Sequence, residues 1–477
     1  PMATPDFPHW AGGFEHDYHK FHAPARGSVH QLERLCAPWI PPWHLAQQDE
    51  GDFSRQRQWT LRLTFWCFLW QVAQVGSSCR DAVRQAISLC ISQGLPAPAD
   101  DSDAYCTARA KLPAERLDAI HRHVVQDAQG RVRQGDLWCG RRVRVLDGTC
   151  VTMPDTSKNQ AAFPQPTVQK PGCGFPVARI LASFCLASGM ILQWVTGHWY
   201  QHELSLLEAL LDSFGADDVL LGDRGFGNVP VLAQCRARGL DGVFRANTAK
   251  RRVDLRRGQR LGKDDRLMVW HRGPKPNYMR ADYWAGLPDQ ITVRVVRVGM
   301  RIPGFRTRSV LLVTTLLDAA KYPPHQLAQL YYRRWEMELC FRHIKTTLQM
   351  DHLSSKSPAM IERELRMHFL SHNLVRRVAL EAARRHLVPV QRISFAGALG
   401  ALHTFAEACL RARSRKAQEQ VRERLYHLLA GDLVPRRPGR REPRAVKRRP
   451  KCYPLLTAPR RQYREFPHKN RYRRPQS

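Results

Sequence analysis

The clearest hydrophobic pattern in the chain runs from Leu327 to Met350, a stretch with neither proline nor glycine and many helix-forming residues. Its apolar side chains recur at a helical spacing and form one stripe, made of Leu330, Met337, Phe341, Ile344 and Leu348. A second, polar stripe lies beside it and contains Tyr331, Arg334, Glu338, Arg342 and Lys345. Most polar helix faces are solvated and paired at i,i+4, but two carboxylates upstream favour a functional face here.

Short apolar runs upstream and downstream predict β-strands. The predicted strands are 143–147, 177–187, 190–196, 218–222, 242–246 and 310–316. The first ends on Asp147, and the fourth leads directly to Asp223 and a glycine-flanked turn. The second and third are joined at Ser188-Gly189, which is a hairpin signal. With helices between the later strands, this order is typical of a mixed α/β sheet.

The charge of the chain narrows the class of partner. Lys and Arg number 75 against 42 Asp and Glu, which gives a formal net charge of +33 and predicts a polyanionic partner. Nucleic acid is favoured over a membrane, because no long basic amphipathic helix and no lipidation signal is visible. The most apolar run, 63–75, is too short to cross a bilayer. The 13 scattered cysteines include no C-x-x-C pair, which argues against disulfide scaffolds and zinc ribbons and favours a reducing cytoplasm.

These patterns divide the chain into six predicted segments. They are a helical N-terminal DNA-binding domain at 1–135, the first part of the α/β catalytic domain at 136–247, a β-rich insertion subdomain at 248–308, the second part of the catalytic domain at 309–386, a helical C-terminal region at 387–435 and a basic Pro/Arg-rich tail at 436–477. A plain packing domain fits the first segment almost as well as a DNA-binding one. The tail has 16 Lys or Arg and two Glu, so we expect it to be solvated or bound to a polyanion.

The carboxylates Asp147, Asp223 and Glu338 are the candidate catalytic and metal-binding residues. A carboxylate at the end of an apolar strand is costly unless it is paired or binds a metal, and Glu338 on the neighbouring helix can converge on the two aspartates. Such an oxygen-rich site suits Mg²⁺ or Mn²⁺, and two ions about 4 Å apart can cleave a phosphodiester. Arg334 and Lys345 would then hold backbone phosphates, and Tyr331 would donate a hydrogen bond to one.

Three motifs resemble those of a known family. The spacing Tyr331-x2-Arg334-x3-Glu338-x6-Lys345 matches the Tyr-Arg-Glu-Lys signature of the insertion-sequence-four family of DDE transposases. Asp147-Gly148-Thr149 resembles the first-Asp motif of that family, and Leu220 to Phe226 (LLGDRGF) resembles its second. The resemblance covers roughly residues 142–377, and the four-residue signature is its most specific part.

The resemblance implies a ribonuclease-H-like catalytic domain, interrupted by a β insertion before the last acidic residue and flanked by helical domains. It implies cut-and-paste transposition in the bacterial cytoplasm, in association with the nucleoid. Two protomers would bind double-stranded transposon ends, nick one strand, cut the other through a DNA hairpin, and join the ends to target DNA. The cofactor would be two Mg²⁺ or Mn²⁺ ions per active site, and Arg224 and Arg342 would be further DNA contacts.

The family also places a tryptophan of the inserted segment against a flipped base. Trp270 and Trp284 both lie in the right region, and the pattern does not choose between them or exclude a core role for each. Two other functions remain open: a nuclease of the same fold that does not transfer strands, and a domesticated DNA-binding protein without chemistry. A zinc site at His198 and His202 has no third ligand nearby in the sequence.

Overall fold

The computed structural model describes residues 28–55, 57–248, 253–299, 309–435, 456–459 and 462–463. The first 27 residues, most of the basic tail and parts of the predicted insertion therefore lie outside the described residues. The described part of the chain begins with helices, as predicted: α2 (Val29–Cys36), α3 (Leu61–Ala73), α4 (Cys79–Ser92), α5 (Asp103–Lys111) and α6 (Ala114–Gln129). In the described part of the chain, no helix has both the length and the apolar character that a membrane crossing requires.

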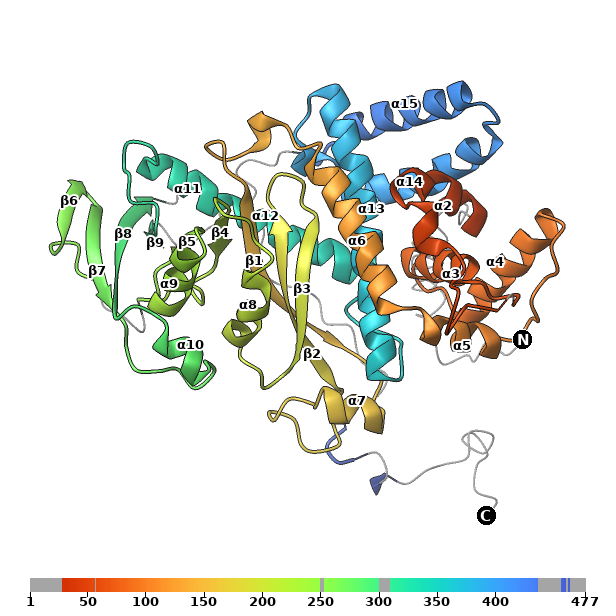
Figure 1. The fold of residues 1–477 in the computed structure, drawn as a ribbon, viewed down its shortest axis with the longest axis horizontal. Coiled ribbons are helices and arrows are strands. Elements are labelled where there is room, and N and C mark those ends of the chain that lie inside the picture. The colour runs from red at the N-terminus through yellow and green to blue at the C-terminus, as the bar shows by residue number, and fades with distance from the viewer. Residues whose placement is uncertain are drawn as a thin grey trace, which may run out of the picture.

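The centre of the molecule is one mixed sheet of nine strands in the order β3-β2-β1-β4-β5-β9-β8-β7-β6 (Figure 1). Its first half consists of β1 (Val143–Thr152), β2 (Val177–Cys185), β3 (Ile191–His198), β4 (Val219–Gly222) and β5 (Asp241–Arg245). Strand β2 is antiparallel to β1 and β3, whereas β4 is parallel to both β1 and β5. The predicted mixed α/β sheet is confirmed, and the Ser188-Gly189 turn joins β2 to β3.

The second half of the sheet comes largely from the segment that the sequence predicts to be an insertion. It consists of β6 (Gln259–Gly262), β7 (Asp265–His271), β8 (Gln290–Gly299) and β9 (Ser309–Thr314), with the short helix α10 (Ala281–Ala285) between β7 and β8. Strand β9 pairs with β5 on one side and β8 on the other, so these strands extend the central sheet and do not form a separate one. The boundaries of an insertion subdomain stay a prediction.

Helices cover both faces of the sheet. On one face, α8 (Glu203–Leu211) and α9 (Val229–Ala237) pack on leucines such as Leu146 and Leu220. On the other, α11 (Pro324–Arg333) and α12 (Trp335–Arg342) pack on Val145 and Phe184. The small helix α7 (Ser157–Ala162) lies between β1 and β2 in sequence.

The predicted helix at 327–350 is correct in its faces but wrong in its continuity. All five members of its apolar stripe are buried, from Leu330 at 0% exposed to Phe341 at 6%. The helix is divided at Arg334, between α11 and α12, and ends in a π-helical turn, His343–Thr347. The stretch 327–350 contains no proline or glycine that would indicate either irregularity.

A second core joins the two ends of the chain. The long helix α13 (Pro358–His386) contacts α3 and α6 as well as α14 (Phe395–Arg411) and α15 (Arg415–Gly431). Helix α14 also packs on α2. Buried side chains from Val29 to Leu429 form one continuous hydrophobic cluster. The N-terminal and C-terminal helices therefore share a core although they are distant in sequence, as Figure 1 shows to the right of the sheet.

Candidate active site

The register of the sheet brings Asp147 and Asp223 to neighbouring positions. Val145 of β1 pairs with Leu221 of the parallel strand β4, and each aspartate follows two residues after its member of this pair. The two aspartates therefore occupy neighbouring positions where β4 ends, although β1 itself continues to Thr152, beyond the predicted end of its strand at Asp147. Each is half-buried and accepts one local hydrogen bond: the Gly148 N–H donates to Asp147 Oδ1 (3.1 Å), and the Gly225 N–H donates to Asp223 Oδ1 (2.7 Å).

Asp147 is held in an environment that resists its ionisation. Burial raises the pKa of Asp147 to about 6, and the carboxylates of Glu203 and Glu338 push it in the same direction. The guanidinium of Arg334 and the Gly148 N–H partly oppose this rise. A group that is disfavoured as an anion gains stability when a cation binds next to it.

Glu338 faces this pair from α12. Its carboxylate is close enough to Asp147 to act on its ionisation, and it accepts a long ion-pair contact of 3.4 Å from Arg334 Nη2. The Glu338 side chain is 47% exposed, so it is free to turn. As the side chains stand, no three His, Cys, Asp or Glu residues in the described ranges are arranged to hold a metal ion. The three-carboxylate site therefore stays a prediction.

Comparison with known proteins decides the family. Residues 138–374 match a family described as "Transposase DDE domain". The chain is 29% identical over 421 residues to the transposase InsG for insertion sequence element IS4 of Escherichia coli strain K12, covering 85% of this chain and 88% of that protein. The chain belongs to the DDE transposases. It is therefore a DNA-cutting enzyme that depends on a divalent metal.

Among solved structures, this transposase is similar to a piggyBac transposase in a synaptic complex with hairpin DNA. The TM-score is 0.40 and the sequence identity 9%, and the match covers 86% of this chain and 87% of the other.

The remaining residues of the Tyr-Arg-Glu-Lys pattern line the same side of the transposase. Tyr331 is 8% exposed, and burial raises the pKa of its phenol, while Arg334, Arg245 and Asp223 also act on it. The Arg334 guanidinium lies 5.9 Å from the centroid of the Tyr331 ring. Lys345 lies in the π-helical turn, and its Nζ contacts Asp351 Oδ1 at 2.8 Å. Arg224 and Arg342 are both exposed.

The two candidate tryptophans differ in accessibility. Trp270 of β7 is 4% exposed and belongs to the hydrophobic core on the face of the sheet that α8 and α9 cover. Trp284 of α10 is half-buried, and the Arg272 guanidinium lies over its ring, 4.6 Å from the centroid. Trp270 matches the core alternative, whereas Trp284 is the more accessible of the two.

Sequence reasoning missed a fourth carboxylate, Glu203, at the first position of α8. Burial raises the pKa of Glu203, and Asp223 raises it further. The available signal was positional: Glu203 follows the strand β3 in the three-stranded unit that carries Asp147. The histidines beside Glu203 suggested only a zinc site, because the sequence pattern does not show that the start of α8 meets Gly148 of β1.

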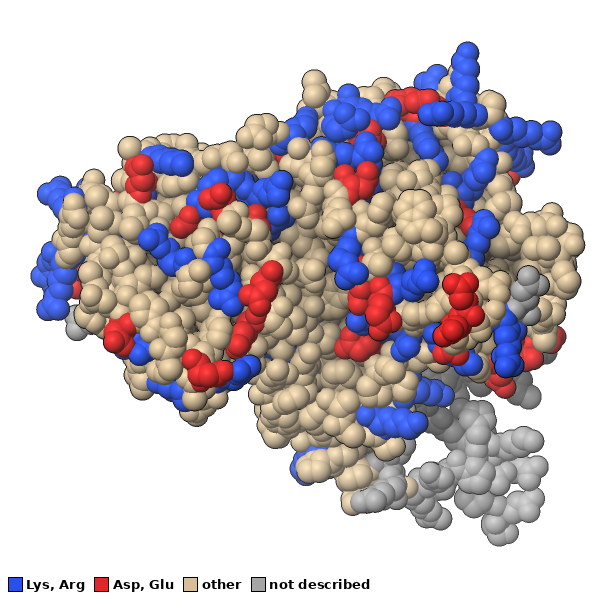
Figure 2. Space-filling model, in the orientation of Figure 1, with Lys and Arg blue, Asp and Glu red and all other residues tan. Residues whose placement is uncertain are grey.

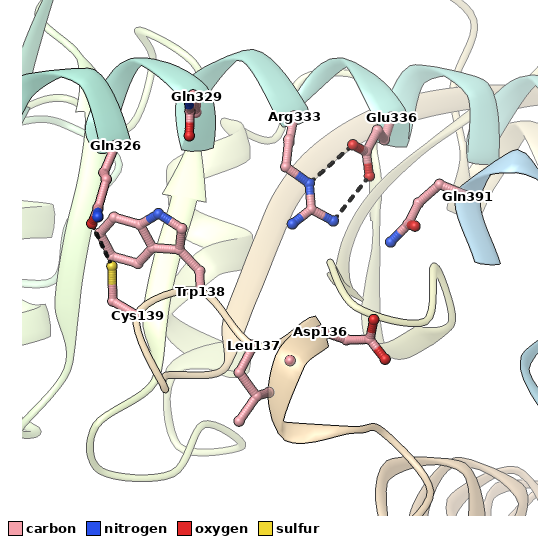
Figure 3. A pocket seen from close by; sticks show the side chains of 10 residues that line it. Asp136, Leu137, Trp138, Cys139, Gln326, Gln329, Arg333, Glu336 and Gln391 are labelled. Atoms are coloured by element: carbon pink, nitrogen blue, oxygen red, sulfur yellow. Dashed lines mark hydrogen bonds and ion pairs between the residues drawn. The ribbon is translucent and has the colours of Figure 1, made fainter. Parts of the chain in front are cut away.

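A separate pocket of about 430 Å³ lies on a different face of α11 and α12 (Figure 3). Its lining includes the Arg333–Glu336 ion pair, in which Arg333 Nε lies 3.0 Å from Glu336 Oε1, and the loop of Trp138 and Cys139. Figure 3 shows these side chains pointing into the space between the helix and that loop. Asp147, Asp223 and Glu338 do not line this pocket, so Glu336 is a natural control for Glu338.

Proposed function

We propose that this enzyme catalyses cut-and-paste transposition of an insertion sequence, with Asp147, Asp223 and Glu338 as its metal-binding catalytic residues. The observation that carries the proposal is the parallel pairing of β1 with β4, which sets the two aspartates side by side opposite Glu338. The order and directions of the first five strands support a ribonuclease-H-like catalytic domain.

The donor set fits a hard divalent cation. Among the described residues, Asp147 and Asp223 each accept one hydrogen bond, from a backbone N–H, so their carboxylates keep further lone pairs for a cation. We propose Mg²⁺ or Mn²⁺, two per active site; when bound, they activate the attacking hydroxyl and stabilise the leaving oxygen of the phosphodiester. Glu338 would reach them by releasing Arg334, to which its contact is long.

The cationic side chains would hold the DNA strand against the carboxylates. The Nε–H of Arg334 is buried and has no hydrogen-bond acceptor among the described residues, which suits an arginine that binds a phosphate. Tyr331, Lys345, Arg342 and Arg224 would contact the backbone nearby, and Trp284 is the better placed of the two tryptophans to stack on a base. The substrates would be transposon ends and target DNA, cut by two protomers through a hairpin.

The test is cleavage of end DNA by single-charge variants. Asp147→Asn, Asp223→Asn and Glu338→Gln should each reduce Mg²⁺-dependent cleavage by at least about 1,000-fold while binding to the ends remains, because the fold and the cationic residues are kept. Glu336→Gln, on the same helix, should cleave like the unmodified enzyme. A denaturing gel would reveal hairpins.

The outcomes separate the alternatives. Wild-type cleavage in any carboxylate variant would remove that residue from the site. Nicking without hairpins or strand transfer would indicate the nuclease, and end binding without any cleavage would indicate the domesticated DNA-binding protein.

A further inference from the structure

The carboxylate of Glu203 occupies space beside the backbone of Asp147. A Cβ atom built on Gly148 would stand only 1.9 Å from Glu203 Oε1 and 2.9 Å from its Cδ. No real Cβ tolerates such distances, so Glu203 can lie there only because residue 148 has no side chain. The glycine of the Asp147-Gly148-Thr149 motif thus has a specific neighbour, and that neighbour is acidic.

The start of α8 is fixed by its own contacts. His202 Nδ1 accepts a hydrogen bond from the Leu204 N–H (3.1 Å), and the His202 ring stacks on Tyr278 at 4.5 Å between centroids. Arg179 Nη1 donates to the Gln201 carbonyl (2.7 Å). These contacts come from β2, from α8 and from the segment before α10. The backbone of Glu203 is therefore held in place, and its side chain is directed toward Gly148 in the middle of β1.

The Glu203 carboxylate lies beside Gly148, the neighbour of Asp147 in the chain, and near Asp223. It acts on Asp147 and is itself acted on by Asp223, and both interactions are repulsive. Arg179 partly offsets the charge, but its guanidinium donates to a backbone carbonyl. Within the described part of the chain, the Glu203 carboxylate is half-buried and makes no hydrogen bond or ion pair that would neutralise it. A carboxylate fixed next to two others stabilises the fold only when a cation joins them.

We propose that Glu203 is a fourth carboxylate ligand of the divalent-metal site at Asp147 and Asp223. This inference rests on the proposed function, because it assigns one more residue to the same site. Glu203 starts from a fixed helix end, whereas Glu338 is exposed and bonded to Arg334. Glu203 would therefore bind the metal before DNA is bound, and Glu338 would complete the site when a DNA phosphate binds Arg334 and releases Glu338.

The first test measures metal binding directly. Mn²⁺ is titrated into the full-length, DNA-free protein, and free Mn²⁺ is followed by electron paramagnetic resonance. Glu203→Gln, which keeps the shape and removes the charge, should weaken Mn²⁺ binding about 10- to 100-fold and raise the Mn²⁺ concentration needed for half-maximal cleavage of end DNA. Glu208→Gln is the matched control, since Glu208 lies on the same helix and acts on Arg280 and Tyr283 of the α10 segment.

The second test uses the contact with Gly148. Gly148→Ala places a methyl group where the carboxylate lies, and the flexible Glu203 side chain can turn away. The variant should lose Mn²⁺ affinity as Glu203→Gln does. In the double variant the two losses should not add, because both remove the same ligand.

Three results would overturn the inference. Glu203→Gln could bind Mn²⁺ as tightly as the unmodified protein and need no more of it for cleavage, which would leave only a structural role. The losses from Gly148→Ala and Glu203→Gln could add in full, which would make them independent. If Asp147→Asn also left Mn²⁺ binding and cleavage unchanged, the proposed metal site itself would be wrong. If Asp147→Asn lost Mn²⁺ binding and cleavage while Glu203→Gln kept both, only the role of Glu203 would be wrong.

Discussion

Ionising a carboxylate that is largely removed from water costs free energy, and Asp147 is in that position. Its folded-state pKa of about 6 lies above the ordinary value of 3.8 because burial and two neighbouring carboxylates disfavour the anion. At neutral pH the chain therefore keeps a charge that weakens its fold. Residues of this kind are characteristic of functional sites, where stability is given up for chemistry.

This gives a prediction on stability. Asp147→Asn should raise the free energy of unfolding of the metal-free protein by about 1–3 kcal/mol at pH 8. Since the pKa is raised in the folded state, the penalty is absent below about pH 4, grows between pH 4 and pH 6, and is complete above pH 6. Urea unfolding in a chelator at pH 5 and pH 8 measures it.

Asp212→Asn is the control for that experiment, because the Asp212 side chain is 82% exposed and its removal should change little. An equal gain for Asp147→Asn at both pH values, or none at either, would contradict the origin that we assign to the raised pKa.

The buried charge of Arg294 differs from that of Asp147, because it is paired with a carboxylate inside the fold. Arg294 of β8 is completely buried and donates from Nε to Asp265 Oδ1 of β7 (2.9 Å) and from Nη1 to the Tyr322 carbonyl (2.7 Å).

Asp265→Ala would leave the guanidinium without its counter-charge, so it should lower the free energy of unfolding by about 3–5 kcal/mol. Urea titration checks this. Asp289→Ala, at a carboxylate that is 89% exposed and paired with Arg272, should cost less than about 1 kcal/mol. Equal losses would mean that burial does not control the cost.

At the scale of elements, the sequence pattern predicted the helices, strands and turns whose formation depends on residues close together in the chain. The strand that leads to Asp223, the Ser188-Gly189 hairpin and the buried stripe of the 327–350 helix all follow from periodicity and turn residues. The strand that carries Asp147 was predicted to end on that residue, but β1 continues to Thr152. The division at Arg334 and the π-helical turn do not, because both depend on how the helix meets the sheet and α14. His343, for example, stacks on Phe395 of α14 with ring centroids 4.7 Å apart.

The pairing of β9 with β5 escaped the pattern for the same reason. The partners Val243 and Thr314 are separated by more than 70 residues, and no local signal specifies that pairing. The same limit applies to the candidate site. Asp147, Asp223 and Glu338 could be predicted from motifs, whereas Glu203 is recognised only from the structure, which places the start of α8 beside Gly148.

The π-helical turn leads to a prediction on DNA binding. Lys345 is paired with Asp351, whose side chain is 50% exposed, so the lysine must leave this partner to bind a phosphate. Asp351→Asn should therefore strengthen binding to end DNA about two- to tenfold at low salt, since an exposed pair is worth up to about 1 kcal/mol. Lys345→Ala should weaken it. Fluorescence anisotropy measures both, and a loss of affinity in Asp351→Asn would argue for a structural role of the pair.

At the scale of the whole molecule, positive charge is spread widely. Figure 2 shows Lys and Arg over much of one face, including the ends formed by β6–β7 and by α14–α15. Exposed basic residues at these ends include Arg256, Arg257, Arg260, Arg413, Arg415 and Lys416. Such a distribution suits a protein that holds more than one DNA segment, because phosphate contacts supply affinity without reading sequence.

The basic tail gives the prediction at this scale. Ending the chain at residue 435 removes 16 Lys or Arg and two Glu. Affinity for end DNA should fall, and the slope of log K against log salt should become shallower by several units if the tail binds phosphates. Arg280→Gln, at an exposed arginine paired with Asp282, should leave the slope nearly unchanged. An unaltered slope after truncation would assign the salt dependence to the folded part of the chain.

The core shared by the first and last helices has a consequence for how the chain is made. Helices α2 to α6 are synthesised long before α13, α14 and α15, and until then the apolar faces that α13 and α14 cover lack their final partners, although α3 already contacts α2, α4 and α5. A chain that ends before α13 would therefore expose part of this apolar surface to water, and we expect such a fragment to aggregate.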